Sequence, residues 1–353
     1  NLPDPTIADG SVYFQTALWS GTSSARSITT TGMSPDWGWI KERGVAGGHN
    51  LYDAVRGATK YLASEDSSAE GTDSAALTSF NSDGFSLGTG FTVKSANKSG
   101  RTYAGWCWDA GTSTVSNTDG SITSSVRANP SAGFSIVSWT GNGTNGATVG
   151  HGLSGAEDGM IIVKNRDFSG VWWATYHASL TTGKVVALNS TQGEFDETYL
   201  TRGIIESVTS STFSCTAGPA GNETANGSGD SHIAYCFAPV SQFSAFGSYT
   251  GNGSSDGPFV ALSFRPALIL LKRTDSTASW QIRDTSRSPH NVVTENLYPN
   301  LSNAESTDSS LNLDILSNGF KPRTSTDGGS NASGGTYIYA CFSEHPFKTA
   351  RAR

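Results

Sequence analysis

Two regions of the chain carry acidic and basic residues at matching intervals. Each has an Asp three positions before an Arg and a Glu further along: Asp53, Arg56 and Glu70, then Asp284, Arg287 and Glu305. Two carboxyl groups at a fixed separation around one sugar would suit a glycosidase. We favour a structural interpretation, a loop-fixing ion pair plus a turn, because such pairs are copied whenever a module is duplicated. The middle of the chain has only Ser179 near the corresponding place.

Other catalytic patterns are missing from the sequence. It has no Gly-x-Ser-x-Gly elbow, no His-Glu-x-x-His and no Walker-type loop. None of the six histidines recurs at an equivalent place along the chain: His49, His151, His177, His232, His290 and His345. We therefore expect no catalytic residues, no cofactor and no enzymatic activity.

Tryptophans are the better candidates for binding, because aromatic rings stack on sugar faces as well as filling cores. The ligand-binding candidates are Trp37, Trp172, Trp173 and Trp280. Trp172 and Trp173 are adjacent, so in a strand their side chains point to opposite faces and one is expected outside the core. That ring would line a binding face or a contact between modules.

One short pattern occurs three times and organises the rest of the chain. An Asn-x-Ser-Gly sequence precedes a β-like run with a Cys ten residues after the Asn: Asn97 with Cys107, Asn226 with Cys236 and Asn331 with Cys341. A repeat at a fixed spacing is typical of duplicated modules. The Asn-x-Ser triplets are formal glycosylation acceptors, but their place before a strand predicts a tight turn instead.

Composition and periodicity predict an all-β fold of three tandem β-sandwich-like repeats of about 100 residues each, with little helix. Only Asn50 to Leu62 is expected to hold one or two helical turns. We expect an N-terminal linker at 1–12, modules at 13–109, 132–238 and 243–353, and a polar linker at 110–131. The start, Asn1 to Pro5, has linker composition without an initiator Met, so we expect a longer or processed product.

In the closing strand of each module, alternate residues form an apolar stripe that should face the core: Ala104, Trp106 and Trp108; Ile233, Tyr235 and Phe237; Ile338, Ala340 and Phe342. The cysteines lie on the other face, where we expect them to fill small, half-buried spaces. Cys215 has no counterpart, and a bridge to Cys236 stays open. Without a Cys-x-x-Cys pair or a nearby His cluster, no metal site is expected.

The net charge of −7 argues against nucleic acid as a partner, because phosphate binding needs clustered Lys and Arg. Lys41, Lys164 and Lys272 recur once per module, and we interpret them as strand-end charges that keep a sheet edge soluble. No run of eighteen apolar residues occurs, so we expect no membrane insertion.

Four longer segments resemble a repeat family of unassigned function found in virion proteins of marine bacteriophages, cyanophages among them. The segments are residues 51–60 (LYDAVRGATK), 78–85 (TSFNSDGF), 139–144 (WTGNGT) and 345–353 (HPFKTARAR). The resemblance implies a virion structural protein of the tail or fibre, and it brings no agreed catalytic residues. The middle module departs from the pattern, since it lacks the Asp-x-x-Arg and Ala-Glu sequences.

We therefore expect a non-catalytic, tail-associated fibre or receptor-binding protein that displays loops for host-surface glycan. Such a protein would be assembled in the host cytoplasm, exposed on the extracellular particle, homo-oligomeric and bound to other virion proteins. The alternative is a purely structural head-decoration or tail component with no ligand. A polysaccharide-degrading enzyme is the third hypothesis, and the missing catalytic pattern disfavours it.

Overall fold

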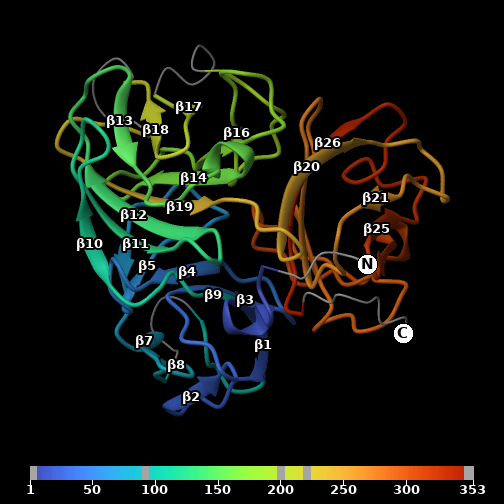
Figure 1. Ribbon diagram of the computed structural model, residues 1–353. Coiled ribbons are helices and arrows are strands. Elements are labelled where there is room, and N and C mark those ends of the chain that lie inside the picture. The colour runs from blue at the N-terminus through green and yellow to red at the C-terminus, as the bar shows by residue number, and fades with distance from the viewer. Residues whose placement is uncertain (1–5, 90–94, 197–202, 218–223, 346–353) are drawn as a thin grey trace.

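The computed structural model describes residues 6–89, 95–196, 203–217 and 224–345, and its regular structure is almost entirely antiparallel β-sheet (Figure 1). The all-β prediction is confirmed. Helical structure in these residues is limited to three single-turn 3-10 helices: η1 (Gly10–Val12), η2 (Ala156–Asp158) and η3 (Ser309–Leu311). Residues 50–62, where we expected one or two helical turns, instead contain strand and turn. Residues 1–5 of the expected N-terminal linker and residues 346–353 of the last matching segment lie outside the described residues.

Three four-stranded units with the same strand order form the inner sheets. In the first, the order is β1 (Phe14–Ser20), β9 (Thr102–Trp108), β3 (Trp37–Glu42) and β4 (His49–Asp53). In the second, it is β12 (Phe134–Thr140), β19 (Ser231–Phe237), β14 (Met160–Asn165) and β15 (Ala174–His177). In the third, it is β20 (Ser244–Thr250), β26 (Thr336–Phe342), β22 (Leu268–Arg273) and β23 (Gln281–Asp284). Each Cys-containing closing strand thus lies second in its unit.

A three-stranded outer sheet accompanies each inner sheet. These sheets are β2 (Arg26–Thr29), β8 (Gly84–Leu87) and β7 (Leu77–Asn81); β13 (Ala147–Gly150), β18 (Thr212–Cys215) and β17 (Ile205–Val208); and β21 (Val260–Ala261), β25 (Gly319–Pro322) and β24 (Leu313–Leu316). A short pair, β5 (Lys60–Tyr61) and β6 (Gly71–Thr72), stands apart. We call each inner sheet with its outer sheet the first, second or third module.

Glycine is required where two of the outer sheets turn. Gly84 and Gly319 have φ of +146° and +155°, and a Cβ there would lie 2.0 Å from the carbonyl oxygen of Ile28 or Val260 on the paired strand. Only glycine accepts this backbone conformation at so close an approach. The Phe that follows each of them, Phe85 or Phe320, is then fully buried in the middle strand of its outer sheet.

Residues 110–131 differ from the expected linker. They contain β10 (Thr114–Asn117) and β11 (Ser124–Asn129), which pair with each other and then with β12, so the second inner sheet is extended on this side; β16 (Val186–Ala187) extends it on the other. The polar composition misled the prediction, because the outward side chains of an exposed edge strand are polar as well. Val126, buried at 2% exposure, is the residue that ties β11 to the core.

The three inner sheets share one hydrophobic core. The closing-strand stripes predicted to face the core do so, and the stripes of all three modules meet there. Trp37 of the first module stacks on Tyr235 of the second with ring centroids 4.3 Å apart. Phe342 of the third module lies 5.7 Å from Phe14 and 5.4 Å from Phe237. No module can therefore complete its inner core without the other two.

Backbone contacts between modules repeat in a ring. In each module the backbone N–H of one Glu donates to a backbone carbonyl of the next module. The accepting residue directly follows the third strand of that module's inner sheet, which is β14, β22 or β3. The three bonds are Glu70 to Arg166 (2.7 Å), Glu194 to Thr274 (2.8 Å) and Glu305 to Arg43 (2.8 Å). At another set of equivalent positions, a side-chain ring N–H donates to a backbone carbonyl of a neighbouring module. These bonds are His49 to Tyr298, Trp173 to Ala63 and Trp280 to Ala187, each at 2.9 Å. The first module contacts the second, the second the third and the third the first, so the ring closes.

The outer face of each inner sheet packs on its outer sheet in a separate, smaller core. Cys107, Cys236 and Cys341 lie in these cores and are fully buried, not half-buried as expected. The expectation was wrong because it assumed that one face of the closing strand was open, whereas each closing strand is sandwiched on both faces.

Candidate functional site

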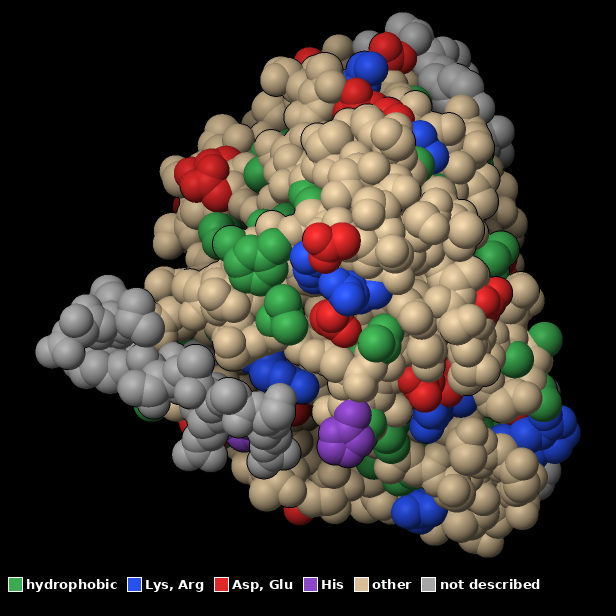
Figure 2. All heavy atoms as spheres, turned by 90° about the vertical axis from the view of Figure 1, so that its right-hand side faces the viewer, with side chains coloured by type: hydrophobic (Ala, Val, Ile, Leu, Met, Phe, Trp, Pro, Cys, Tyr) green, Lys and Arg blue, Asp and Glu red, His purple; other side chains and the backbone are tan. Residues whose placement is uncertain are grey.

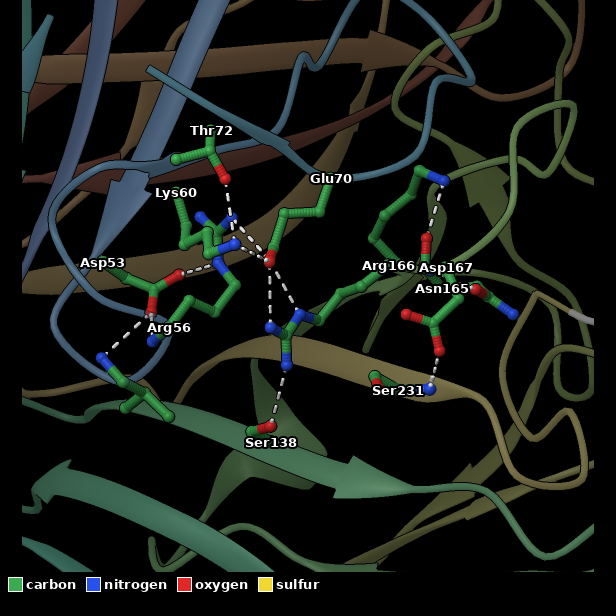
Figure 3. A network of polar contacts seen from close by, with 12 residues as sticks. Asp53, Arg56, Lys60, Glu70, Thr72, Ser138, Asn165, Arg166, Asp167 and Ser231 are labelled. Atoms are coloured by element: carbon green, nitrogen blue, oxygen red, sulfur yellow. Dashed lines mark hydrogen bonds and ion pairs between the residues drawn. The ribbon is translucent and has the colours of Figure 1, made fainter. Parts of the chain in front are cut away.

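The predicted carboxylate pattern of the first module forms a buried ion-pair network at its contact with the second module (Figure 3). Asp53 and Arg56 pair directly, and both side chains are fully buried. Asp53 also accepts from Tyr235 Oη of the second module at 2.9 Å. Glu70 binds Arg56 at 3.3 Å and accepts two bonds from Arg166 of the second module, from Nε at 2.8 Å and Nη2 at 3.0 Å.

The third module repeats the network at its contact with the first. Asp284 pairs with Arg287, again with no exposed side-chain surface, and accepts from Trp106 Nε1 of the first module at 3.0 Å. Glu305 binds Arg287 Nη1 at 2.8 Å and takes a two-pronged bond from Arg43 of the first module. Both networks therefore join neighbouring modules.

The second module has neutral groups at the positions of the Asp and the Arg. The register of the strands places His177, not Ser179, where Asp53 and Asp284 lie. The Nε2 atom of His177 lies 2.9 Å from the backbone oxygen of Tyr339 in the third module, and Leu180 stands in place of the arginine. Burial lowers the pKa of His177 to about 4, so it is neutral near pH 7.

These networks have the features of connectors and not of a catalytic site. Burial raises the pKa of Glu70, but the hydrogen bond from Arg166 and the charge of Arg56 outweigh it and hold the pKa below its usual range. The corresponding bonds from Arg43 and Arg287 do the same for the pKa of Glu305. A general acid needs a raised pKa and access to substrate. The lowered pKa of Glu70 and the complete burial of the Asp53 side chain do not meet these requirements, which supports the structural interpretation of the sequence pattern.

The three recurring lysines are fully buried, contrary to the expectation that they keep an exposed edge soluble. Their ammonium groups donate to backbone carbonyls: Lys41 to Glu42 at 2.6 Å, Lys164 to Asn165 at 2.8 Å, and Lys272 to Ala278 at 2.7 Å. Burial lowers the pKa of Lys41 and Lys164 to about 8 and that of Lys272 to about 7. Each lysine thus fixes loop backbone; Lys272 also binds Thr191 O of the second module at 2.9 Å.

Most of the tryptophan candidates lie away from the surface. Trp37, Trp173 and Trp280 are in the shared core with 1%, 0% and 1% exposure, so they cannot stack on a ligand in solution. Trp172 is half-buried and packs edge-on against Phe195, with ring centroids 5.5 Å apart. Of the adjacent pair, Trp173 lies in the shared core, and Trp172 packs against the separate core of the second module.

The repeated asparagines hold the loops that follow β1, β12 and β20. Asn331, for example, donates through Nδ2 to the Thr324, Ser254 and Asn252 oxygens and accepts from Asn252 N. Asn97 and Asn226 are also fully buried and bind the corresponding loops. Their side chains are therefore inaccessible to glycosylation, and the following glycines adopt the positive φ of the predicted turn.

The cysteines are all free and buried. Cys215 lies in β18 of the outer sheet and faces the Cys236 strand across the same core instead of pairing beside it. Among the residues that the structure describes, no group of three or more His, Cys, Asp or Glu is arranged to hold a metal ion. In the same residues, no helix has the length and apolar character needed to cross a bilayer.

Two of the hollows on the surface of the described residues are small and polar. One, of about 300 Å³, lies between the β3–β4 hairpin and the segment before β9, and its lining includes Glu42, Asn50 and Arg101. The other, of about 240 Å³, is lined mainly by Ser and Thr beside Trp139 and Arg166. Figure 2 shows a face dominated by uncharged polar groups and backbone, with acidic and basic side chains in small mixed groups. Sequence reasoning missed Glu42 and Asn50, although Glu42 differs from its counterparts Asn165 and Arg273.

The fold is an all-β body of three inner sheets, each packed on an outer sheet, with polar hollows on its surface. A family model described as "Domain of unknown function (DUF7483)" matches residues 9–346, so the chain belongs to this family. No curated protein matches the sequence.

Proposed function

We propose that this chain is a structural protein of a bacteriophage particle, part of a tail-associated fibre or receptor-binding assembly, and that it recognises host-surface glycan without catalysis. The observation that carries the proposal is the shared core closed by a ring of contacts between modules. Such a body holds its loops in fixed positions, which lowers the ordering cost of binding. Many copies on one particle would then strengthen weak individual contacts.

The mechanism differs in one respect from aromatic stacking by the predicted tryptophans. Because Trp37, Trp173 and Trp280 are buried, recognition would depend on polar groups of the hollows and loops. Hydroxyl and guanidinium groups line both hollows, and the first also has the Glu42 carboxylate and the Asn50 amide; these groups bind sugar hydroxyls by hydrogen bonds.

The same burial favours a second candidate, a purely structural head-decoration or tail component with no ligand. One experiment separates the candidates. Antibody against the chain is used to locate it on intact phage particles, and the purified chain is tested for binding to a panel of marine bacteria, cyanobacteria included, with heat-unfolded chain as control.

We expect labelled tails and saturable binding to some strains. Labelled particles without binding to any strain would favour the purely structural role. Release of reducing sugar from the bound polysaccharide would show an enzyme, and absence of the chain from particles would refute both virion roles.

A further inference from the structure

The 300 Å³ hollow of the first module contains two buried oxygen atoms that accept no hydrogen bond from the residues that the structure describes. We call it the Glu42 pocket; its lining includes Glu42, Gly47, Asn50, Ser95, Lys98 and Arg101. The two atoms are Glu42 Oε1, which has only an ion-pair contact, and Asn50 Oδ1, and their residues are only 5% and 1% exposed. Buried acceptors are nearly always paired in folded proteins, so two in one pocket indicate that donors from outside complete them.

Two cationic side chains lie beside these acceptors. Arg101 is 30% exposed, and its Nε lies 3.3 Å from Glu42 Oε1 as an ion pair. Lys98 is exposed at the rim. A metal ion would suit the oxygen atoms but not this positive rim. The pocket therefore offers acceptors inside and positive charge outside.

Equivalent positions in the other modules have internal partners. Glu42 corresponds to Asn165 and Arg273 by strand register. Asn165 donates to Asp230 at 2.8 Å and accepts from Asp167 N at 2.9 Å, while Arg273 binds Asp275 at 2.9 Å.

Asn50 corresponds to Ala174 and Gln281. Ala174 has no polar group, and Gln281 binds both Asp327 and Arg283 at 2.9 Å. The fold therefore does not require open acceptors at these positions, and the first module is the one in which both are left for a ligand.

We propose that the Glu42 pocket binds a polyhydroxylated carboxylic acid, as in a uronic acid unit of a glycan. Two ligand hydroxyls donate to Glu42 Oε1 and Asn50 Oδ1, and the ligand carboxylate lies toward Lys98 and Arg101. A volume of about 300 Å³ is at the small end of ligand pockets and suits a monosaccharide-sized group. The inference deepens the glycan-binding role and rests on it for the biological source of the ligand.

Calorimetric titration of the whole chain tests the pocket directly. The probes are glucuronate, its methyl glycoside as a mimic of a glycan end, glucose as the neutral match and acetate as the acid without hydroxyls. We expect glucuronate or its glycoside to bind about tenfold or more tightly than glucose, because glucose lacks the charge-assisted bond, and acetate not to bind. Tighter binding of the glycoside would point to a glycan, and tighter binding of free glucuronate to a soluble acid.

Three variants assign the binding to this pocket. Asn50→Ala, with the residue that the second module has at this position, should weaken glucuronate about tenfold by removing one acceptor, and Arg101→Gln at the part-exposed rim should reduce the preference over glucose. Arg273→Gln, at the third-module position equivalent to Glu42, should change nothing. An unchanged melting temperature shows that a variant is folded.

Equal binding of all probes, binding unaffected by both pocket variants, or no binding to the wild-type chain would overturn the proposal. If the wild-type chain binds cells and Asn50→Ala binds them equally well, the pocket assignment fails and the proposed function stands. If glucuronate binds as expected but no cell does, the pocket stands and the proposed function fails.

Discussion

Replacing Arg56 by Leu should strongly destabilise the contact between the first two modules. The Arg56 side chain has no exposed surface, and besides pairing with Asp53 it donates to Leu51 O at 2.8 Å and to Tyr235 Oη at 3.1 Å. Removing one partner of a buried pair leaves an uncompensated charge and typically costs about 3–5 kcal/mol. Asp53 keeps bonds from the Val55 and Arg56 N–H groups and from Tyr235, so we expect a loss near the lower end, about 3 kcal/mol.

The double variant Asp53→Asn/Arg56→Leu should be less destabilised than the sum of its single variants, because the asparagine carries no buried charge that needs the arginine. The second module shows that the fold accepts a neutral pair, since His177 and Leu180 occupy these positions.

The assay is urea unfolding at pH 7, followed by tryptophan fluorescence, with the free energy taken from the midpoint and slope. Arg323→Leu is the matched control: its ion pair with Asp256 has 39% and 77% side-chain exposure, and solvent screening leaves such an exposed pair little effect on stability. A loss for Arg56→Leu no larger than this control, or a double variant as destabilised as the sum, would refute the connector role.

Three further predictions concern the shared core and the titrating groups. Trp37→Ala should cost about 3–5 kcal/mol and leave a single unfolding transition, in which the Cys341 thiol becomes reactive at the same urea concentration as fluorescence changes; two separate transitions would argue against a shared core. Folding lowers the pKa values of Glu70 and Glu305, so the stability that these carboxylates contribute is fully present above the unfolded pKa of 4.5 and is lost as the pH falls through the folded pKa values. Urea unfolding from pH 6 to 3 should show this loss of stability, and the loss should be smaller in the double variant Glu70→Gln/Glu305→Gln. The pKa of Lys272 is lowered from 10.5 to about 7, so the unfolded chain binds more protons between these values and stability should rise with pH there, by at most about 1.4 kcal/mol per pH unit; urea unfolding of Lys272→Met from pH 7 to 9.5 should show a smaller rise, and an equal rise would contradict the assignment.

The fold class was predictable from the sequence because alternation and turn chemistry are local. Trp106 and Trp108 alternate with Gly105 and Cys107, which correctly predicted a strand with a large apolar face. The union of the three inner sheets was not predictable, since a buried stripe is the same whether it packs on its own module or on two others. For the same reason Trp37 and Trp280 were mistaken for binding candidates.

The candidate site was harder to predict than the fold, because what marks it is two buried oxygen atoms that accept no hydrogen bond, and a sequence does not show hydrogen bonds. The Asp53 and Arg56 pattern is repeated and therefore visible in the sequence, but the structure gives it a connecting role. Glu42 and Asn50 have no Glu or Asn counterpart that repeats in all three modules, and only the structure shows that their side-chain oxygens Oε1 and Oδ1 accept no hydrogen bond. A repeated residue thus indicated structure here, and a departure from the repeat indicated the binding candidate.

The ring of contacts explains how such departures are tolerated. Glu70, Glu194 and Glu305 all donate their backbone N–H across a module boundary, but their carboxylates bind different groups: Glu70 and Glu305 bind arginines of the next module, and Glu194 binds Thr181 and Lys184 of its own module. The backbone contact survives a change of side chain, because it depends only on where the chain lies. Side chains near the boundaries are therefore free to diverge between modules while the body stays closed, and the Glu42 pocket lies beside one such boundary, where Gly47 N donates to Ser302 O of the third module.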